Sequence, residues 1–154
     1  MYTAKKLIKQ AGTRVDAICD FVGTGGSFLG ISKALRQANP KVLCFIVGPE
    51  SAAVLAGKRI TNPNHKIQGG GYSKKDSKFL KDVKVDGYIQ ISNEEAIDMS
   101  RRLAREEGIF AGFSSGANVA AALRLLEHKL EGKTIACLIN DSGLKYLSTD
   151  LWQA

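Results

Sequence analysis

Two patterns of apolar and polar residues alternate along this chain. Residues 15–22, 42–47 and 134–139 are short, nearly continuous apolar runs, which are typical of strands buried on both faces of a sheet. Between such runs, apolar residues recur at helical spacing, as in the segment from Phe28 to Leu35. Buried strands joined by helices predict an α/β fold with a mostly parallel sheet and helices on both faces.

Capping and breaking residues indicate where several elements end. Gly12 stops a first helix, and Asn39-Pro40 ends the second. The run Ser92-Asn93-Glu94-Glu95 fits a capping box that opens a helix, and Gly108 closes that helix. The expected helices cover residues 5–11, 28–38, 51–58, 93–105 and 117–130, and the expected strands cover residues 15–22, 42–47, 88–91, 109–113 and 134–139.

Residues 61–84 interrupt this alternation with a polar, glycine-rich segment. A connector of that length without its own elements is uncommon in a compact domain, so we expect a functional surface loop or flap. The length of 154 residues fits one domain. We therefore expect residues 1–154 to form a single domain that carries this flap.

Composition narrows the class of protein. Hydrophobic residues make up 44% of the chain, and the longest apolar run, residues 42–47, is far too short to span a membrane. No apolar segment of signal-peptide length follows Met1, so we expect a cytoplasmic protein. The three cysteines lie within apolar runs and predict buried free thiols in a reducing compartment, not disulfides or a metal site.

The formal net charge of +7 raises the question of a nucleic-acid partner. The basic residues do not form one stripe with interleaved aromatic residues. Arg101, Arg102 and Arg105 share a predicted helix with several glutamates. This distribution favours a solvated surface over a nucleic-acid interface, and a positive field also suits a small anionic substrate or a phosphorylated cofactor.

A glycine-rich loop joins the first predicted strand to the second predicted helix. Its residues are Gly23, Thr24, Gly25, Gly26 and Ser27, and they follow Val22 directly. The glycines let the backbone turn sharply, so that amides at the helix start can point at a phosphate, while Thr24 and Ser27 add hydroxyl donors. The sequence predicts a phosphate cradle at residues 23–27.

Three other interpretations of this loop can be compared with the sequence, and two of them fail. A dinucleotide fingerprint needs its third glycine at position 28, where this chain has Phe28. A P-loop needs Gly-Lys-Ser/Thr, which does not follow. The remaining alternative is a glycine turn that only packs a helix on a strand, although three glycines and two hydroxyls in five residues exceed what such a turn needs.

Four motifs in a fixed order resemble those of the cysteine synthase family, pyridoxal-phosphate (PLP) enzymes of the tryptophan-synthase-β-like fold. The motifs are Gly23-Thr24-Gly25-Gly26-Ser27, Lys66-Ile67-Gln68-Gly69-Gly70-Gly71, Gly112-Phe113-Ser114-Ser115-Gly116-Ala117, and Asp141-Ser142-Gly143 with Tyr146-Leu147-Ser148-Thr149. Each motif alone is weak, but together they cover nearly the whole chain. The resemblance implies an incomplete large cofactor-binding domain of that fold.

The resemblance also implies roles for particular residues. Residues 23–27 would hold the phosphate of PLP, Ser114 would hydrogen-bond the pyridine nitrogen, and Gln68, Gly69 and Gly71 would belong to a loop beside the substrate. A serine at the ring nitrogen suits loss of a leaving group from Cβ followed by addition of a nucleophile. The implied reaction makes cysteine from an activated serine and sulfide.

The family also needs a lysine that forms the Schiff base with PLP, in a motif well before the phosphate loop. Only residues 1–22 precede that loop here. Ser73-Lys74-Lys75-Asp76 imitates the lysine motif but follows the glycine loop at residues 69–71, and Lys33 and Lys145 lie on predicted helix or tail positions. We therefore expect no catalytic lysine in this chain, no activity of the chain alone, and association with itself or with an amino-terminal half.

Other functions fit the same residues. A serine or threonine dehydratase and a cystathionine β-synthase-like enzyme would use the same scaffold, because the residues that select among these reactions lie mostly outside this chain. A non-catalytic module that binds a phosphate-bearing ligand is a further alternative, since the cradle is intact without the lysine.

Overall fold

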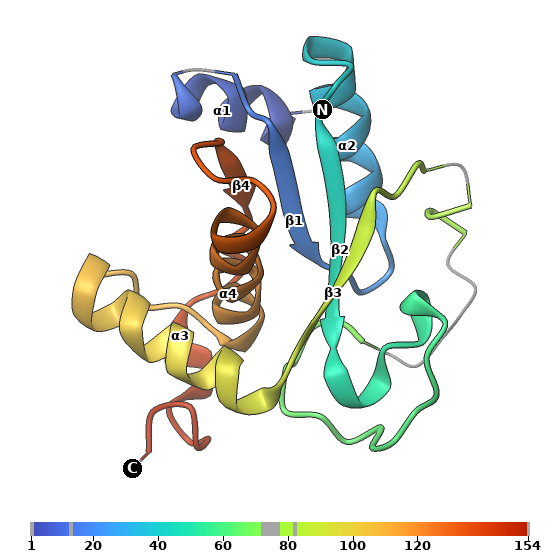
Figure 1. The fold of residues 1–154 in the computed structure, drawn as a ribbon. Helices are drawn as coiled ribbons and strands as arrows, with labels where there is room; N and C mark the ends of the chain where they lie inside the picture. Colours follow the sequence, from blue (N-terminus) through green and yellow to red (C-terminus); the bar gives the residue numbers. More distant parts are fainter. Residues whose placement is uncertain (1, 13, 72–77, 82, 154) are drawn as a thin grey trace.

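A parallel sheet forms the centre of the computed structural model, which describes residues 2–12, 14–71, 78–81 and 83–153 (Figure 1). Its strands are β1 (Ala17–Phe21), β2 (Leu43–Pro49), β3 (Gly87–Ile91) and β4 (Ile135–Cys137), in the order β3-β2-β1-β4. All three strand pairs are parallel. The predicted α/β fold is confirmed.

Helices cover both faces of the sheet (Figure 1). One face carries α1 (Tyr2–Ala11) and α2 (Gly26–Ala38), and the other carries α4 (Phe113–His128), on which α3 (Asn93–Glu107) packs. Along β1, Ala17, Cys19 and Phe21 pack in the cluster with α3 and α4. Ile18 instead packs in the cluster with α1 and α2, so the strand is apolar on both faces.

The predicted capping box is present at the start of α3. Ser92 Oγ accepts a hydrogen bond from the Glu95 amide (3.1 Å), and the Ser92 amide donates to Glu95 Oε2 (2.8 Å). At the other end, Gly108 takes a left-handed conformation with φ +68°. Both ends of this helix follow from local sequence.

The strand expected over residues 109–113 is wrong. This segment forms only an isolated bridge between Ala111 and Ser142, and α4 already begins at Phe113 rather than at residue 117. Phe113, Ser114 and Ser115 of the motif at residues 112–117 therefore lie inside the first turn of a buried helix. Apolar spacing alone does not distinguish a buried helix start from a short strand.

Two further differences from expectation concern residues 51–58 and the last strand. The helix expected over residues 51–58 is two 3₁₀ turns, η1 (Glu50–Ala52) and η2 (Val54–Ala56). The last strand ends at Cys137 rather than at residue 139, and the Leu138 carbonyl that follows it accepts a hydrogen bond from the Asn118 side chain (2.9 Å). A third 3₁₀ turn, η3 (Gly143–Tyr146), follows in the closing segment.

Several global features of the described residues bear on the class of protein. None of the described helices is long and apolar enough to cross a membrane. Cys19, Cys44 and Cys137 are free thiols, and Cys19 and Cys44 are fully buried. Burial raises the pKa of the Cys19 thiol to about 12 and that of Cys44 to about 11.

Candidate functional site

The glycine loop and the start of α2 form a set of backbone donors at the carboxyl end of β1. Gly25 is the N-cap, with φ +92°, a conformation that favours glycine. The first backbone hydrogen bond of the helix runs from the Leu29 amide to the Gly25 carbonyl (2.9 Å). Within the described residues, the amides of residues 26–28 have no hydrogen-bond acceptor, so they are available to an anion at the positive end of the helix dipole.

A cavity of about 320 Å³ lies against these donors, and we call it the glycine-loop cavity. That volume is in the range typical of small-molecule sites. Its lining comes from β1, the cradle, the loop at residue 69, the start of α4 and the segment after β4. The lining residues are Asp20, Phe21, Val22, Gly23, Thr24, Gly25, Gly26, Ser27, Phe28, Gly69, Ser114, Asn140 and Asp141.

The structure brings together seven of the nine residues that the sequence predicts for the site, which are the five of the cradle, Gly69 and Ser114. Gln68 is exposed and does not line this cavity. Gly71 lines a different cavity. Sequence reasoning missed Asp20 and Asn140, and it named Asp141 in a family motif without assigning it to the site. An acid within an apolar strand and polar residues after a buried strand are both signals of a site.

Ser114 lies in the first turn of α4 and is only 4% exposed. The Asn140 side-chain amide donates to Ser114 Oγ (3.2 Å), and the Asn140 backbone amide donates to Ser115 Oγ (3.0 Å). The two serines therefore hold the segment after β4 against the helix start. Ser114 Oγ lies where a ligand in the cavity can reach it.

Residues of the fourth motif, at 141–149, hold the Asp141 side chain in the cavity wall. Tyr146 is almost fully buried, packs edge-on against Phe113 (ring centroids 5.2 Å apart) and donates its hydroxyl hydrogen bond to Asp141 Oδ2. Burial and the Asp141 carboxylate raise the pKa of Tyr146. Lys145 Nζ lies 3.5 Å from the same carboxylate oxygen. The carboxylate is thus held in place from two sides.

The loop of residues 66–71 is fastened beside the sheet. Ile67 is fully buried, and the Lys66 amide donates to Asn93 Oδ1 (2.8 Å). The Gly71 amide donates to the Val22 carbonyl (3.2 Å) at the end of β1. Tyr72 and the motif Ser73-Lys74-Lys75-Asp76 lie outside the described residues.

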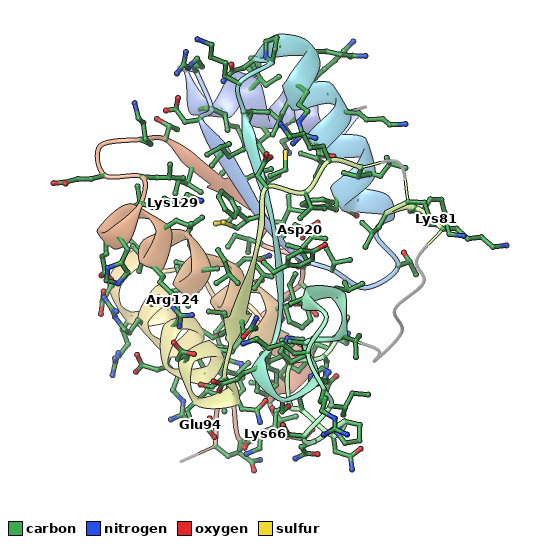
Figure 2. The ribbon with its side chains drawn as sticks, turned by 45° about the vertical axis from the view of Figure 1, so that its right-hand side comes forward. Asp20, Lys66, Lys81, Glu94, Arg124 and Lys129 are labelled. Carbon is green, nitrogen blue, oxygen red and sulfur yellow. The ribbon has the colours of Figure 1, made fainter. Side chains whose placement is uncertain are left out.

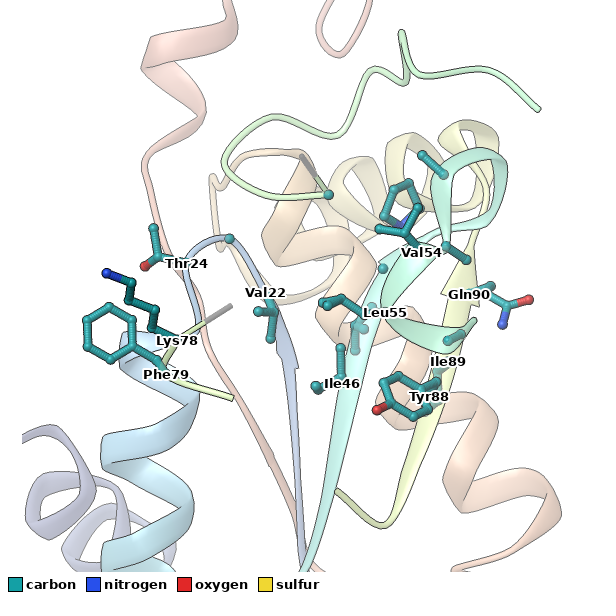
Figure 3. A pocket seen from close by; sticks show the side chains of 18 residues that line it. Val22, Thr24, Ile46, Val54, Leu55, Lys78, Phe79, Tyr88, Ile89 and Gln90 are labelled. Carbon is teal, nitrogen blue, oxygen red and sulfur yellow. The ribbon is translucent and has the colours of Figure 1, made fainter. Parts of the chain in front are cut away.

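A second, larger cavity of about 480 Å³ lies on the other side of the cradle (Figure 3). Its lining comes from the ends of β2 and β3, from η1 and η2, and from Lys78 and Phe79. Most of that lining is aliphatic, as with Ile46, Val54 and Leu55. We place the candidate site in the glycine-loop cavity, because that cavity contains the helix-start amides and the polar side chains.

No described lysine lines the glycine-loop cavity. Lys33 lies in a shallow outer groove on α2 with Arg36. The Lys145 side chain is 62% exposed, and its ammonium group lies near Asp141 and over the Tyr146 ring. Neither lysine is among the residues that line the glycine-loop cavity.

Comparison with known proteins gives the class to which this fold and site belong. A family model described as "Pyridoxal-phosphate dependent enzyme" matches residues 2–141. The chain belongs to the pyridoxal-phosphate-dependent enzyme family.

Particular relatives narrow that class. The chain is 37% identical over 151 residues to a cysteine synthase of Staphylococcus aureus (strain N315), covering 97% of this chain and 48% of the relative. It is 39% identical to an O-ureido-L-serine synthase of Streptomyces lavendulae, covering 97% of this chain and 46% of that protein. The chain spans about half the length of these relatives.

Solved structures give the same result. O-acetyl serine sulfhydrylase isoform 3 of Entamoeba histolytica matches 99% of this chain with a TM-score of 0.91 and 35% identity, over 45% of that structure. An O-acetylserine-dependent cystathionine β-synthase of Helicobacter pylori matches 97% of this chain with a TM-score of 0.88 and 29% identity, over 48% of that structure. The predicted resemblance to cysteine synthases and the tryptophan-synthase-β-like fold are confirmed.

Proposed function

We propose that this chain forms the phosphate-binding part of a PLP-dependent enzyme that makes cysteine from an activated serine and sulfide. The observation that carries the proposal is the set of amides at the start of α2, which have no acceptor within the described residues and belong to residues that line a cavity of about 320 Å³. These amides and the positive helix end suit a phosphate dianion. The similarity to cysteine synthases supports the choice of PLP and of the reaction.

Each predicted residue has a proposed task toward the cofactor. The amides of residues 26–28 and the hydroxyls of Thr24 and Ser27 hold the phosphate, and Ser114 hydrogen-bonds the ring nitrogen. When bound, PLP withdraws electrons from Cα of an amino-acid substrate, which eases loss of a leaving group from Cβ. Gly69, which lines the cavity, borders the substrate, and Gln68 and Gly71 belong to the same substrate loop. This loop is part of the surface segment 61–84 of the single domain, of which the structure describes residues 61–71, 78–81, 83 and 84.

We further propose that this chain alone does not complete the reaction. In this proposal another polypeptide segment supplies the lysine that forms the Schiff base with PLP. In support, no described lysine lines the glycine-loop cavity. The same observation favours one alternative, a non-catalytic module that binds a phosphate-bearing ligand. Saturable binding without turnover, even with an amino-terminal half supplied, would favour that alternative.

The test of the proposal is selective binding of a vitamin B6 phosphate. Pyridoxine 5'-phosphate has no aldehyde and cannot react with surface lysines, so calorimetry reports the cavity alone. We expect it to bind at least about tenfold more tightly than pyridoxine, since charge-assisted hydrogen bonds contribute about 1.5–3 kcal/mol each. Equal affinity for the two compounds would contradict the phosphate cradle.

Two alanine variants locate the binding. Gly25→Ala forces a side chain into the conformation with φ +92° and should reduce the preference for the phosphate by about tenfold. Gly30→Ala, on the same helix where an added Cβ meets nothing within 4 Å, should leave the preference unchanged. An unchanged preference in Gly25→Ala would place the ligand elsewhere.

We also propose that the chain associates with itself or with an amino-terminal half. Several large apolar side chains are more than a third exposed near the segments that flank the cavity: Ile109, Phe110, Ile139, Leu144 and Leu147. Exposed apolar residues on this scale are typical of an interaction surface. Sedimentation velocity at micromolar concentration should show a dimer or larger species, and a single monomeric species would contradict self-association.

A further inference from the structure

Asp20 is a buried acid that the proposed function does not use. It is the fourth residue of β1, is 3% exposed, and pairs in register with Ile46 of β2. Figure 2 shows Asp20 inside the molecule, whereas Lys66, Lys81 and Glu94 lie at its periphery. Burying an acid in an apolar strand is costly, so its place requires a reason.

The side chain of Asp20 lies on the face of the sheet that α2 covers. Successive side chains of a strand alternate between faces, and Ile18 and Val22 pack in the cluster with α2. Asp20 therefore lies on the α2 side of β1. It lines the glycine-loop cavity together with the cradle and the first turn of α2.

The charges around this cavity do not favour two anions inside it. Among the described residues, no lysine, arginine or histidine lines the cavity, whereas Asp20 and Asp141 do. Asp141 has Lys145 and Tyr146 as partners. The Asp20 carboxyl has no hydrogen bond or ion pair within the described residues, so an ionised Asp20 would repel a phosphate without compensation.

The nearest titratable groups to Asp20 are thiols on the opposite face of the sheet, and they are neutral. Burial raises the pKa of Asp20 to about 7. The neighbouring thiols of Cys19 and Cys137 have pKa values raised by burial to about 12 and about 11, so they stay protonated at neutral pH. Residue Ile46 on β2 is apolar, and the first turn of α2 contains no acid.

We propose that Asp20 is protonated whenever a phosphate occupies the cradle, so that binding of a phosphate-bearing ligand takes up one proton from solvent. This inference rests on the proposed function of the cradle. The neutral carboxyl removes one negative charge from the cavity and adds an O–H donor to the amides at the α2 start. The affinity for the phosphate therefore falls as Asp20 ionises.

Calorimetry with pyridoxine 5'-phosphate between pH 6 and pH 8 tests the inference, with pyridoxine as the reference ligand. If only the protonated form binds, the apparent affinity scales with its fraction, which is about one tenth at one pH unit above the pKa. Between pH 6 and pH 8, the affinity of wild type for pyridoxine 5'-phosphate should fall about tenfold more than the affinity of Asp20→Asn does. Measured in buffers of different ionisation enthalpy, wild type should take up close to one proton at pH 8, and Asp20→Asn should take up fewer.

Matched variants make the outcome unambiguous. Asp16→Asn changes an acid at the start of the same strand segment, where its carboxylate accepts from the Thr134 amide, and should follow wild type. Asp20→Ser provides a second neutral variant and should follow Asp20→Asn. If the affinity of wild type and of both Asp20 variants depends on pH in the same way, the inference about Asp20 is wrong. If pyridoxine 5'-phosphate is still preferred over pyridoxine in that case, the proposed phosphate site at residues 23–27 is still supported. Loss of that preference in every variant at every pH would overturn the cradle and the inference together.

Discussion

Gly116→Ala should lower the free energy of unfolding by at least about 3 kcal/mol, because α3 and α4 leave no room for a side chain at this position. A Cβ on Gly116 would lie 2.2 Å from the Ala96 carbonyl oxygen, 2.2 Å from Ser100 Oγ and 2.8 Å from the Ser100 amide. Two of these three atoms belong to the backbone and cannot turn away. The helices would have to separate, and Ser114 would move with α4.

Urea unfolding followed by fluorescence of Trp152, the single tryptophan, measures this effect. Trp152 packs on Phe110 with ring centroids 4.4 Å apart, so its emission should report loss of tertiary structure. Gly30→Ala is the control, because a Cβ there meets nothing within 4 Å and helix propensity favours alanine by about 0.5–1 kcal/mol. A change within about 0.5 kcal/mol of wild type in Gly116→Ala would show that α3 and α4 do not approach as closely as described.

Asp20 should make the chain less stable at pH 8 than at pH 5, by about 2 to 3 kcal/mol. Burial raises the folded-state pKa of Asp20 from 3.8 to about 7, so the folded chain binds more protons than the unfolded chain between these values. Stability from this group is therefore greatest at low pH and is lost as pH rises through this window. Above about pH 8 the contribution is exhausted.

Urea unfolding at pH 5, 6, 7 and 8 should show this decline in wild type and a flatter profile in Asp20→Asn. Asp16 has a pKa lowered by hydrogen bonds from Thr134 and Arg14, so its contribution is lost only as pH falls below the ordinary carboxyl range. The stability of Asp16→Asn should therefore decline between pH 5 and pH 8 as in wild type. Parallel profiles for wild type and Asp20→Asn would mean that Asp20 is solvated in the folded chain.

Local sequence was sufficient where neighbouring residues supply the physical cause. Ser92 and Glu95 cap each other within one turn, so the start of α3 could be predicted. The segment at 109–113 could not, because its apolar pattern suits a strand or a helix start equally well. Its outcome depends on Ser142, which bridges to Ala111 from a distant part of the chain.

The α/β class, the family resemblance and the position of the glycine loop could all be predicted from the sequence, since periodicity and glycine-rich turns depend on a few neighbouring residues. Which distant side chains line the same cavity follows only from the folded chain. Parallel strands align their carboxyl ends, and this register brings Asp20, Ser114 and Asp141 to one edge of the sheet. Burial and the balance of charge at that edge depend on all of these segments at once, so no single stretch of sequence contains them.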